Sequence, residues 1–213
     1  MKYVRKPTAI IVSPLLLLML SGCAFGEGFQ QGRAAGRAYD GSAHYKAGEL
    51  DLAIEDYNQA IEIDPEYAPA YAGRAWAYFD KGLPKPALVD AKKAVELEPM
   101  AAEAYHARGA AYILNSQPDL ALNDLNKAIE LEPENARIYP NRGALQWSIG
   151  NKEEALTDFH KSLDISTDPG DREFIARSLQ SEVPSFRDQL GVTQNETERQ
   201  QIEDLLQKIG VDP

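Results

Sequence analysis

The sequence predicts an all-α solenoid, in which four pairs of helices stack one after another and a helical C-terminal cap follows. The main observation is a 34-residue period, in which alanines, prolines and tyrosines return at fixed intervals. The recurring residues are Ala53, Ala87, Ala121 and Ala155; Pro65, Pro99 and Pro133; and Tyr71, Tyr105 and Tyr139. Within each period, apolar residues recur every three to four positions in two segments, which is typical of two amphipathic helices. Because one pair cannot bury its apolar face alone, we expect the four pairs to share a continuous core.

Residues 1–22 have the layout of a secretory signal peptide. Lys2, Arg5 and Lys6 precede an apolar run over residues 8–20. That run is shorter than the roughly 20 residues that a transmembrane helix needs. We therefore expect the segment to be a cleaved signal rather than a membrane-spanning helix.

The apolar run ends in the sequence LSGC, and Cys23 is the only cysteine of the chain. This sequence resembles the lipobox of bacterial lipoproteins, which implies cleavage before Cys23, acylation of its thiol and attachment to the membrane. By the same resemblance, Ala24 in place of aspartate after the cysteine favours the outer membrane, with the protein facing the periplasm. Residues 24–33 contain three glycines and no helical periodicity. We therefore expect Cys23 and these residues, 23–33, to form the lipidated, flexible tether of about 18 Å.

The repeating part divides into 34–67, 68–101, 102–135 and 136–167. The 34-residue length and the fixed aromatic, alanine and proline positions resemble the tetratricopeptide repeat (TPR), which implies a right-handed α-solenoid. Residues 168–213 leave the period and are expected to form capping helices. The last of these carries an apolar stripe, which either packs onto the solenoid or serves a partner. The stripe consists of Ile202, Leu205, Leu206 and Ile209.

A second periodic set carries charge. It comprises Asp56, Asp90, Asp124 and Asp158 together with Arg74, Arg108 and Arg142. In the first repeat the place of the arginine is taken by Asp40, so pairing inside that repeat would set two like charges, Asp40 and Asp56, against each other. We therefore predict ion pairs between neighbouring repeats, each worth about 0–1 kcal/mol where exposed and more where buried. The predicted pairs are Asp56–Arg74, Asp90–Arg108 and Asp124–Arg142.

The resemblance to TPR proteins also implies that the first helix of each repeat lines a concave groove. The groove residues expected on this basis are Tyr45, Trp76, Phe79, His106, Ile113, Leu114 and Trp147. For Tyr45 and Ile113, packing against the second helix of the same pair is an equal alternative. Full burial of a tryptophan is rare, so both tryptophans are expected to face the groove.

Some TPR proteins grip a carboxylate at the C-terminus of a partner with basic groove residues. The equivalent positions here are Ala38, Ser42, Gly73, Glu103 and Ala107. The resemblance therefore gives no support for such a clamp. An apolar peptide or helix of a protein partner is the expected occupant.

The net charge of −11 argues against nucleic-acid binding, because such a surface repels a phosphate backbone. His44, His106 and His160 are widely spaced and form no metal-ligand motif, and we expect no metal, no cofactor and no catalytic site. The sequence thus favours a lipid-anchored envelope scaffold that binds a protein partner. Two alternatives remain open: a receptor for a small ligand or cell-wall fragment, and a homo-oligomer that associates through its own groove or last helix.

Overall fold

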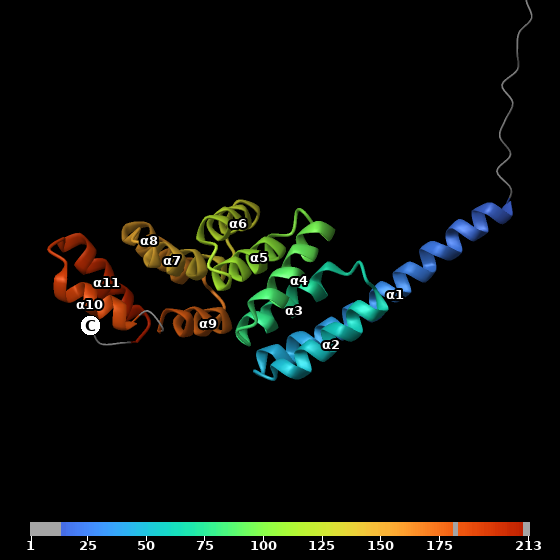
Figure 1. Cartoon of the computed structure of the whole chain (residues 1–213), viewed down its shortest axis with the longest axis horizontal. Coiled ribbons are helices and arrows are strands. Elements are labelled where there is room, and N and C mark those ends of the chain that lie inside the picture. Colours follow the sequence, from blue (N-terminus) through green and yellow to red (C-terminus); the bar gives the residue numbers. More distant parts are fainter. Residues whose placement is uncertain (1–13, 181–182, 211–213) are drawn as a thin grey trace, which may run out of the picture.

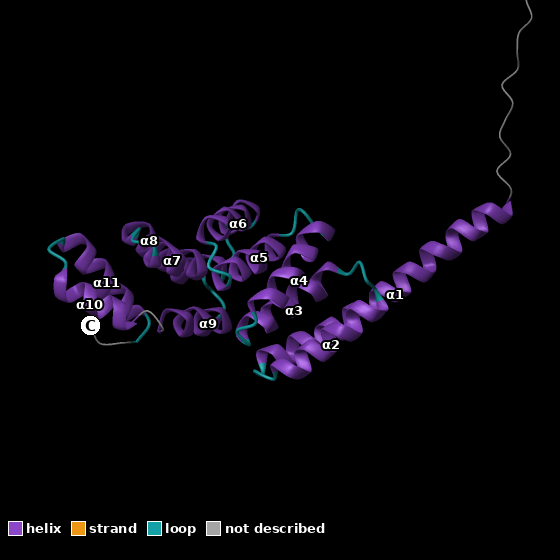
Figure 2. Ribbon diagram, in the orientation of Figure 1, coloured by secondary structure: helices purple, strands orange, loops and turns teal. Residues whose placement is uncertain are grey.

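The computed structural model describes residues 14–180 and 183–210, and within these ranges the chain is an all-α solenoid (Figure 1, Figure 2). The predicted fold class is confirmed. The four pairs are α1 (Pro14–Lys46) with α2 (Leu50–Ile63), α3 (Ala68–Asp80) with α4 (Pro84–Leu97), α5 (Ala102–Leu114) with α6 (Pro118–Leu131), and α7 (Ile138–Ser148) with α8 (Lys152–Ile165). The C-terminal helices are α9 (Pro169–Gln180), α10 (Val183–Val192) and α11 (Glu196–Lys208).

The recurring prolines end the second helix of each of the first three pairs. These helices end at Ile63, Leu97 and Leu131, two residues before a proline in each case. A proline disfavours helical backbone in the residue before it and has no N–H to donate. The recurring tyrosine of the next helix then holds this loop, because its hydroxyl donates a hydrogen bond to the proline carbonyl. These bonds are Tyr71 to Pro65 (3.0 Å), Tyr105 to Pro99 (3.2 Å) and Tyr139 to Pro133 (2.6 Å).

The turn inside each pair requires left-handed backbone at one position. Gly48, Gly82 and Gly150 have φ values of 78°, 67° and 94°. Ser116 stands at the equivalent position of the third pair and has φ of 55°. A residue with a Cβ is unfavourable in this region, so the third turn carries strain that the other three avoid.

Close approach of the two helices depends on complementary volumes at one facing position. Gly143 faces Phe159, and a Cβ added to the glycine would lie 2.5 Å from the ring. Gly41 faces Tyr57 and Gly109 faces Leu125, where an added Cβ would come within 3.0 and 2.9 Å. In the second pair the first helix carries Ala75, which is larger than glycine, and the second helix carries Ala91, which is smaller than the residues at this position in the other pairs. Both alanines are buried.

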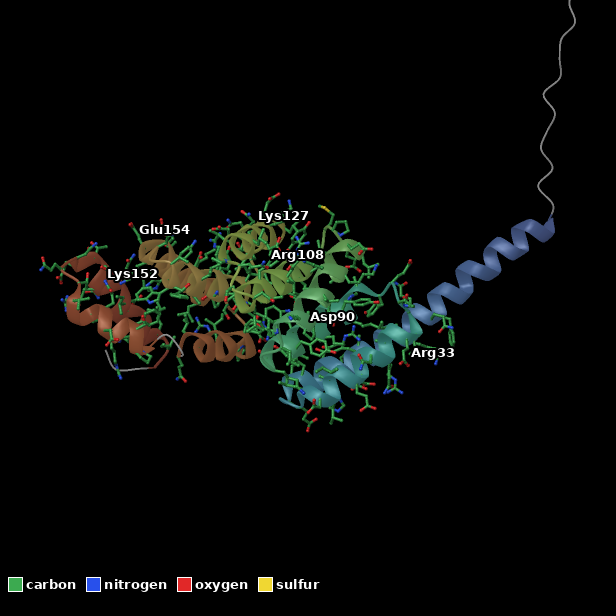
Figure 3. All side chains as sticks on the ribbon, viewed as in Figure 1. Arg33, Asp90, Arg108, Lys127, Lys152 and Glu154 are labelled. Atoms are coloured by element: carbon green, nitrogen blue, oxygen red, sulfur yellow. The ribbon has the colours of Figure 1, made fainter. Side chains whose placement is uncertain are left out.

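The charged pairs form within repeats and not between them, so the predicted pairing is wrong. Each arginine of a first helix makes two hydrogen bonds to the aspartate of the second helix of the same pair. The donor–acceptor distances are 2.7 and 2.8 Å for Arg74–Asp90, 2.6 and 2.9 Å for Arg108–Asp124, and 2.8 and 2.6 Å for Arg142–Asp158. The hydrogen bond to the aspartate raises the pKa of Arg108 and of Arg142 above its usual value, so these pairs stay ionised. Figure 3 shows Asp90 and Arg108 among the helices, with Lys127 and Glu154 at the outer margin.

The first repeat avoids the like-charge contact that motivated the wrong prediction. Asp40 points to Arg37 at 3.6 Å, on an exposed part of α1. Asp56, which is buried, is held instead by Nδ1 of His44 at 2.6 Å and more weakly by Arg37 at 4.0 Å. His44 therefore takes the place of the missing arginine from one helical turn further along α1.

At two junctions, neighbouring repeats are joined by Nη1 of the arginine, the guanidinium nitrogen that does not bind the aspartate. Nη1 of Arg74 donates to Asn58 of the preceding pair at 2.5 Å, and Nη1 of Arg142 donates to Asn126 at 2.7 Å. The equivalent position at the junction of the second and third pairs is Lys92, a cation that cannot accept a hydrogen bond from Arg108. This junction therefore lacks the bridge found at the other two.

The first helix continues through the segment that was expected to be an irregular tether. Because α1 begins at Pro14, residues 23–33 are helical, and the expectation of a flexible tether is wrong. Propagating a helix that is already anchored by packing on α2 avoids the cost of nucleation, although each glycine is about 1 kcal/mol less favourable than alanine in a helix. Figure 1 shows the N-terminal part of α1 projecting beyond the other helices.

Of the predicted signal peptide, residues 1–22, positions 1–13 lie outside the described residues, whereas positions 14–22 and Cys23 fall within α1. Across residues 14–180 and 183–210, no helix combines the length and the hydropathy needed to cross a bilayer.

The C-terminal helices cap the fourth pair. Helix α9 contacts α7 and α8, and α11 contacts α8 and α10. Ile175, Leu179 and Phe186 are buried in a core cluster shared with Phe159. The apolar stripe of α11 belongs to the same cluster, so of the two alternatives the structure shows the packed one.

The missing bridge at the second junction leads to a prediction for stability. We expect Lys92→Asn to have a free energy of unfolding about 0.5–1 kcal/mol higher than that of Lys92→Ser, because asparagine supplies an acceptor at the position of Asn58 and Asn126, while both variants lose the contact of the Lys92 ammonium with the Tyr112 ring. Urea denaturation followed by circular dichroism measures this change. Lys92→Ser is the matched control, since serine removes the same charge and has similar helix propensity but is too short to reach Arg108. Equal stability of the two variants would contradict the bridge.

Candidate interaction groove

The first helices of the pairs form one continuous inner layer. Helix α3 contacts both α1 and α5, and α5 contacts α7, while each second helix contacts its own partner and the next first helix. This arrangement places the outward side chains of α1, α3, α5 and α7 along one face. The predicted groove residues lie on these four helices.

The centre of this face is a cluster around Trp76. The ring of Trp76 packs edge-on against His106, with centroids 4.6 Å apart, and against Phe79, with centroids 5.6 Å apart. Its indole N–H donates to Oε1 of Glu103 at 2.6 Å. Trp76 and Phe79 remain half-buried, so parts of both rings are accessible. We call Trp76, Phe79, Glu103 and His106 the Trp76 cluster.

His106 forms the floor of this cluster and not its surface. It is only 3% exposed. Its Nε2 lies 2.9 Å from the side-chain nitrogen of Asn141 on the next first helix, and its Nδ1 lies 3.9 Å from Oε2 of Glu103. The histidine therefore links three repeats through its neighbours and holds the face of Trp76 in place.

The cluster carries negative charge. The side chain of Glu103 is 56% exposed. Desolvation by the surrounding protein would raise the pKa of this carboxyl, but the hydrogen bond and charge of His106 and the hydrogen bond from Trp76 outweigh it, so the pKa is lowered. Glu103 is thus ionised at neutral pH and partly open to solvent.

A second carboxylate lies on the same face near the first pair. Burial raises the pKa of Asp80 above its usual value, while the interaction with Tyr45 opposes the change. Burial also raises the pKa of the Tyr45 hydroxyl far above its usual range, and the charge of Asp80 adds to this. Tyr45 itself is half-buried and packs against the core cluster of the first pair, which is the packing alternative that the sequence leaves open.

Trp147 does not face an open groove, so that prediction is wrong. It is 6% exposed because α10 covers it: the ring of Phe186 packs edge-on with centroids 4.8 Å apart, and the indole N–H donates to the hydroxyl of Ser185 at 2.7 Å. The ammonium group of Lys152 lies 5.4 Å from the ring centroid. Helix α10 therefore covers Trp147 on the inner face of the fourth repeat.

The remaining predicted residues contribute less to an open surface. Ile113 is half-buried and packs against the core cluster of the third pair. Leu114 is also half-buried. Among the predicted groove residues, the partly accessible aromatic rings are those of Tyr45, Trp76 and Phe79.

Sequence reasoning missed Glu103, Asn141 and Phe186 as parts of this face. In the sequence, Glu103 stands out only as a position where a carboxylate clamp would carry a basic residue. A signal for it existed, because it stands at the start of α5, where a side chain reaches the first helix of the preceding repeat. No periodic signal points to Phe186, since it lies after the repeats.

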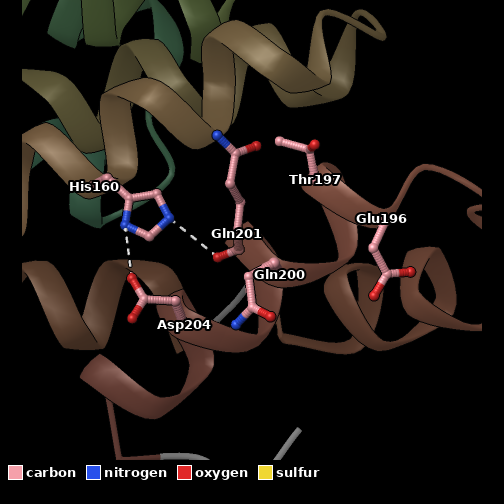
Figure 4. A pocket seen from close by; sticks show the side chains of 6 residues that line it. All are labelled: His160, Glu196, Thr197, Gln200, Gln201 and Asp204. Atoms are coloured by element: carbon pink, nitrogen blue, oxygen red, sulfur yellow. Dashed lines mark hydrogen bonds and ion pairs between the residues drawn. The ribbon is translucent and has the colours of Figure 1, made fainter.

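A shallow cavity of about 600 Å³ lies elsewhere, between α8 and α11 (Figure 4). It is lined by His160, Glu196, Thr197, Gln200, Gln201 and Asp204. Nε2 of His160 is 3.1 Å from the carbonyl oxygen of Gln201, and Nδ1 is 3.4 Å from Asp204. These contacts attach α11 to α8, which gives His160 a structural role in the cap. In the described part of the chain, no group of three His, Cys, Asp or Glu residues has a metal-binding arrangement.

Comparison with known proteins identifies the repeats. Residues 41–82 match the family model described as TPR repeat, and residues 102–135 match the model described as tetratricopeptide repeat. The chain therefore contains tetratricopeptide repeats. No curated protein matches it.

Solved structures show the same fold. A thermophilic TPR protein of Thermus thermophilus is 20% identical, with 82% of this chain and 99% of that chain covered and a TM-score of 0.62. PilF of Pseudomonas aeruginosa is 22% identical, with 86% and 79% covered and a TM-score of 0.62. The first TPR of Spaghetti (RPAP3), solved with the HSP90 peptide SRMEEVD, is 28% identical, with 55% and 92% covered and a TM-score of 0.50.

The different surroundings of the two tryptophans lead to a prediction for fluorescence. We expect acrylamide to quench Trp76 readily and Trp147 only weakly, because the ring of Trp147 is covered by α10. The chain has two tryptophans, so Trp147→Phe reports on Trp76 alone and Trp76→Phe reports on Trp147 alone. Stern–Volmer constants measure the difference. Similar constants for the two variants would show that the cap does not cover the fourth repeat.

Proposed function

We propose that this chain is a lipid-anchored scaffold of the bacterial envelope, which binds a segment of a protein partner in the groove of its first three repeats. The observation that carries the binding role is the Trp76 cluster, a partly exposed aromatic surface held rigidly by hydrogen bonds from three repeats. Tryptophan held in this way is typical of residues that dominate the energy of an interface. TPR modules are in general protein-interaction modules without catalytic activity, and a TPR neighbour of this chain was solved with a bound peptide.

The anchoring part of the proposal depends on the sequence LSGC after an apolar run. Acyl chains contribute about 0.8 kcal/mol per buried methylene, so several chains on Cys23 would hold the protein firmly at a membrane. Attachment at Cys23, within α1, would confine the groove to a layer near the membrane surface. This confinement raises the effective concentration of any partner that is also held there.

Photocrosslinking in cells tests the binding role. A photoreactive phenylalanine analogue at position 79 is expected to give an adduct with one protein, because Phe79 is accessible beside Trp76. Adding Trp76→Ala should reduce this adduct about tenfold or more, the effect of losing a residue that dominates an interface. The same analogue at Val89, an exposed position on the second helix α4, should give no such adduct. An adduct that is equally strong with and without Trp76→Ala would show that the partner does not bind on the Trp76 cluster.

Fractionation tests the anchoring role. Wild type is expected in the membrane fraction, and Cys23→Ser is expected to lose acylation, as measured by mass spectrometry of the N-terminal peptide. Cys23→Ser should then accumulate as the uncleaved form. An acylated or cleaved Cys23→Ser chain would contradict the lipoprotein assignment, whatever the groove binds.

A further inference from the structure

We infer that the groove selects its partner segment through an arginine side chain, which stacks on Trp76 and pairs with the carboxylate of Glu103. This inference rests on the proposed function and names the chemistry that the partner must carry. It depends on three observations: how the solenoid holds its own arginines, which groups the groove offers, and the charge around them.

The solenoid already holds three arginines with one combination of groups. Each guanidinium lies over a tyrosine ring and makes two hydrogen bonds to an aspartate. The distances from the guanidinium carbon to the ring centroid are 5.7 Å for Arg74 and Tyr71, 5.3 Å for Arg108 and Tyr105, and 5.8 Å for Arg142 and Tyr139. An aromatic face supplies cation–π attraction and a carboxylate accepts the fork of N–H groups. The combination is thus a working arginine site in this fold.

The Trp76 cluster presents the same two groups on an accessible face. The indole of Trp76 and the carboxylate of Glu103 are joined by a hydrogen bond of 2.6 Å, so their relative position is fixed before a partner binds. Oε1 accepts this bond, and Oε2 lies 3.9 Å from His106. A carboxylate has about four lone-pair sites, so acceptor capacity remains. The 56% exposure of the Glu103 side chain leaves that capacity open to a guest.

The surrounding charge favours a cationic guest. Asp80 adds a second carboxylate to the same face, and the whole chain has a net charge of −11. Arg137, whose Nε lies 2.8 Å from Asp171, is a cation of the chain that acts on this face: its charge contributes to the lowered pKa of Glu103 and opposes the raised pKa of Tyr45, so it offsets part of the negative charge there.

Arginine fits this site better than lysine. The guanidinium is planar, stacks on an aromatic face and donates in a fork, whereas the ammonium of lysine is compact and strongly hydrated. A segment with an arginine beside apolar residues would place the guanidinium on Trp76 and Glu103 and its neighbours on Phe79. One partner segment would then combine the apolar side chains that the sequence predicts for the guest with a positive charge that complements Glu103.

The test uses a nonapeptide library with random apolar flanks and a fixed central residue, which is arginine, citrulline or glutamate. Citrulline has the shape of arginine without its charge. The full chain, purified in mild detergent, is expected to bind the arginine peptides about tenfold more tightly than the citrulline peptides, a difference of about 1.4 kcal/mol. Fluorescence anisotropy of labelled peptides measures the ratio.

Two variants connect the preference to the site. Glu103→Gln keeps an acceptor for the indole N–H of Trp76 but removes the charge, so the ratio of arginine to citrulline binding should fall to about one. Glu62→Gln, at an exposed position of α2, removes one charge from the chain and should leave the ratio unchanged.

Each other outcome has a separate meaning. Equal binding of arginine and citrulline peptides that is lost in Trp76→Ala would overturn the arginine inference and leave the proposed function standing. A preference that survives Glu103→Gln, or that falls equally in Glu62→Gln, would also overturn it by showing general charge attraction. Failure of all peptides to bind would overturn both the inference and groove binding.

Discussion

The close approach of the two helices in each repeat is the constraint on which the rest of the solenoid depends. It requires a glycine or alanine at one position of the first helix, opposite a side chain of complementary size on the second. The pair Gly143 and Phe159 leaves no room for a single extra carbon, while Ala75 and Ala91 share the same space between them. Interiors are packed as densely as organic crystals, so the two volumes must change together. This coupling fixes the distance between the helices and therefore the reach of every side chain that joins them.

The short distance between the two helices explains why the arginine–aspartate pairs form within a repeat. At this spacing, the guanidinium of Arg108 reaches Asp124 with two hydrogen bonds while it stacks on Tyr105. Tyr105 in turn holds the loop at Pro99. One tyrosine, one arginine and one aspartate thus tie together the loop, the first helix and the second helix. Removing the aspartate would leave a largely buried guanidinium without its partner, which is costly.

The sequence predicts the parts of this fold that repeat, because period and amphipathicity depend on local spacing. It was misleading where an irregular residue decides the outcome. Asp40 in the arginine position suggested pairing between repeats, yet His44 compensates from the next turn of the same helix. Trp147 was expected in the groove by its repeat position, but the side chain that covers it, Phe186, lies beyond the repeats. Contacts between distant segments of unlike sequence leave no period to detect, so only the structure reveals them.

The cap makes the two ends of the groove unequal, and this inequality defines what the groove can hold. In a stack of identical repeats, equivalent aromatic positions would offer a series of similar surfaces. Here Trp147 is occupied by the chain's own Phe186 and Ser185, whereas Trp76 presents part of its ring beside Phe79. Helix α9 also ties Arg137 to Asp171 at the border between these regions. Under the proposed function, a guest would meet one acidic aromatic surface rather than a continuous apolar channel, and its register along the first helices would be set by the side chain that fits there.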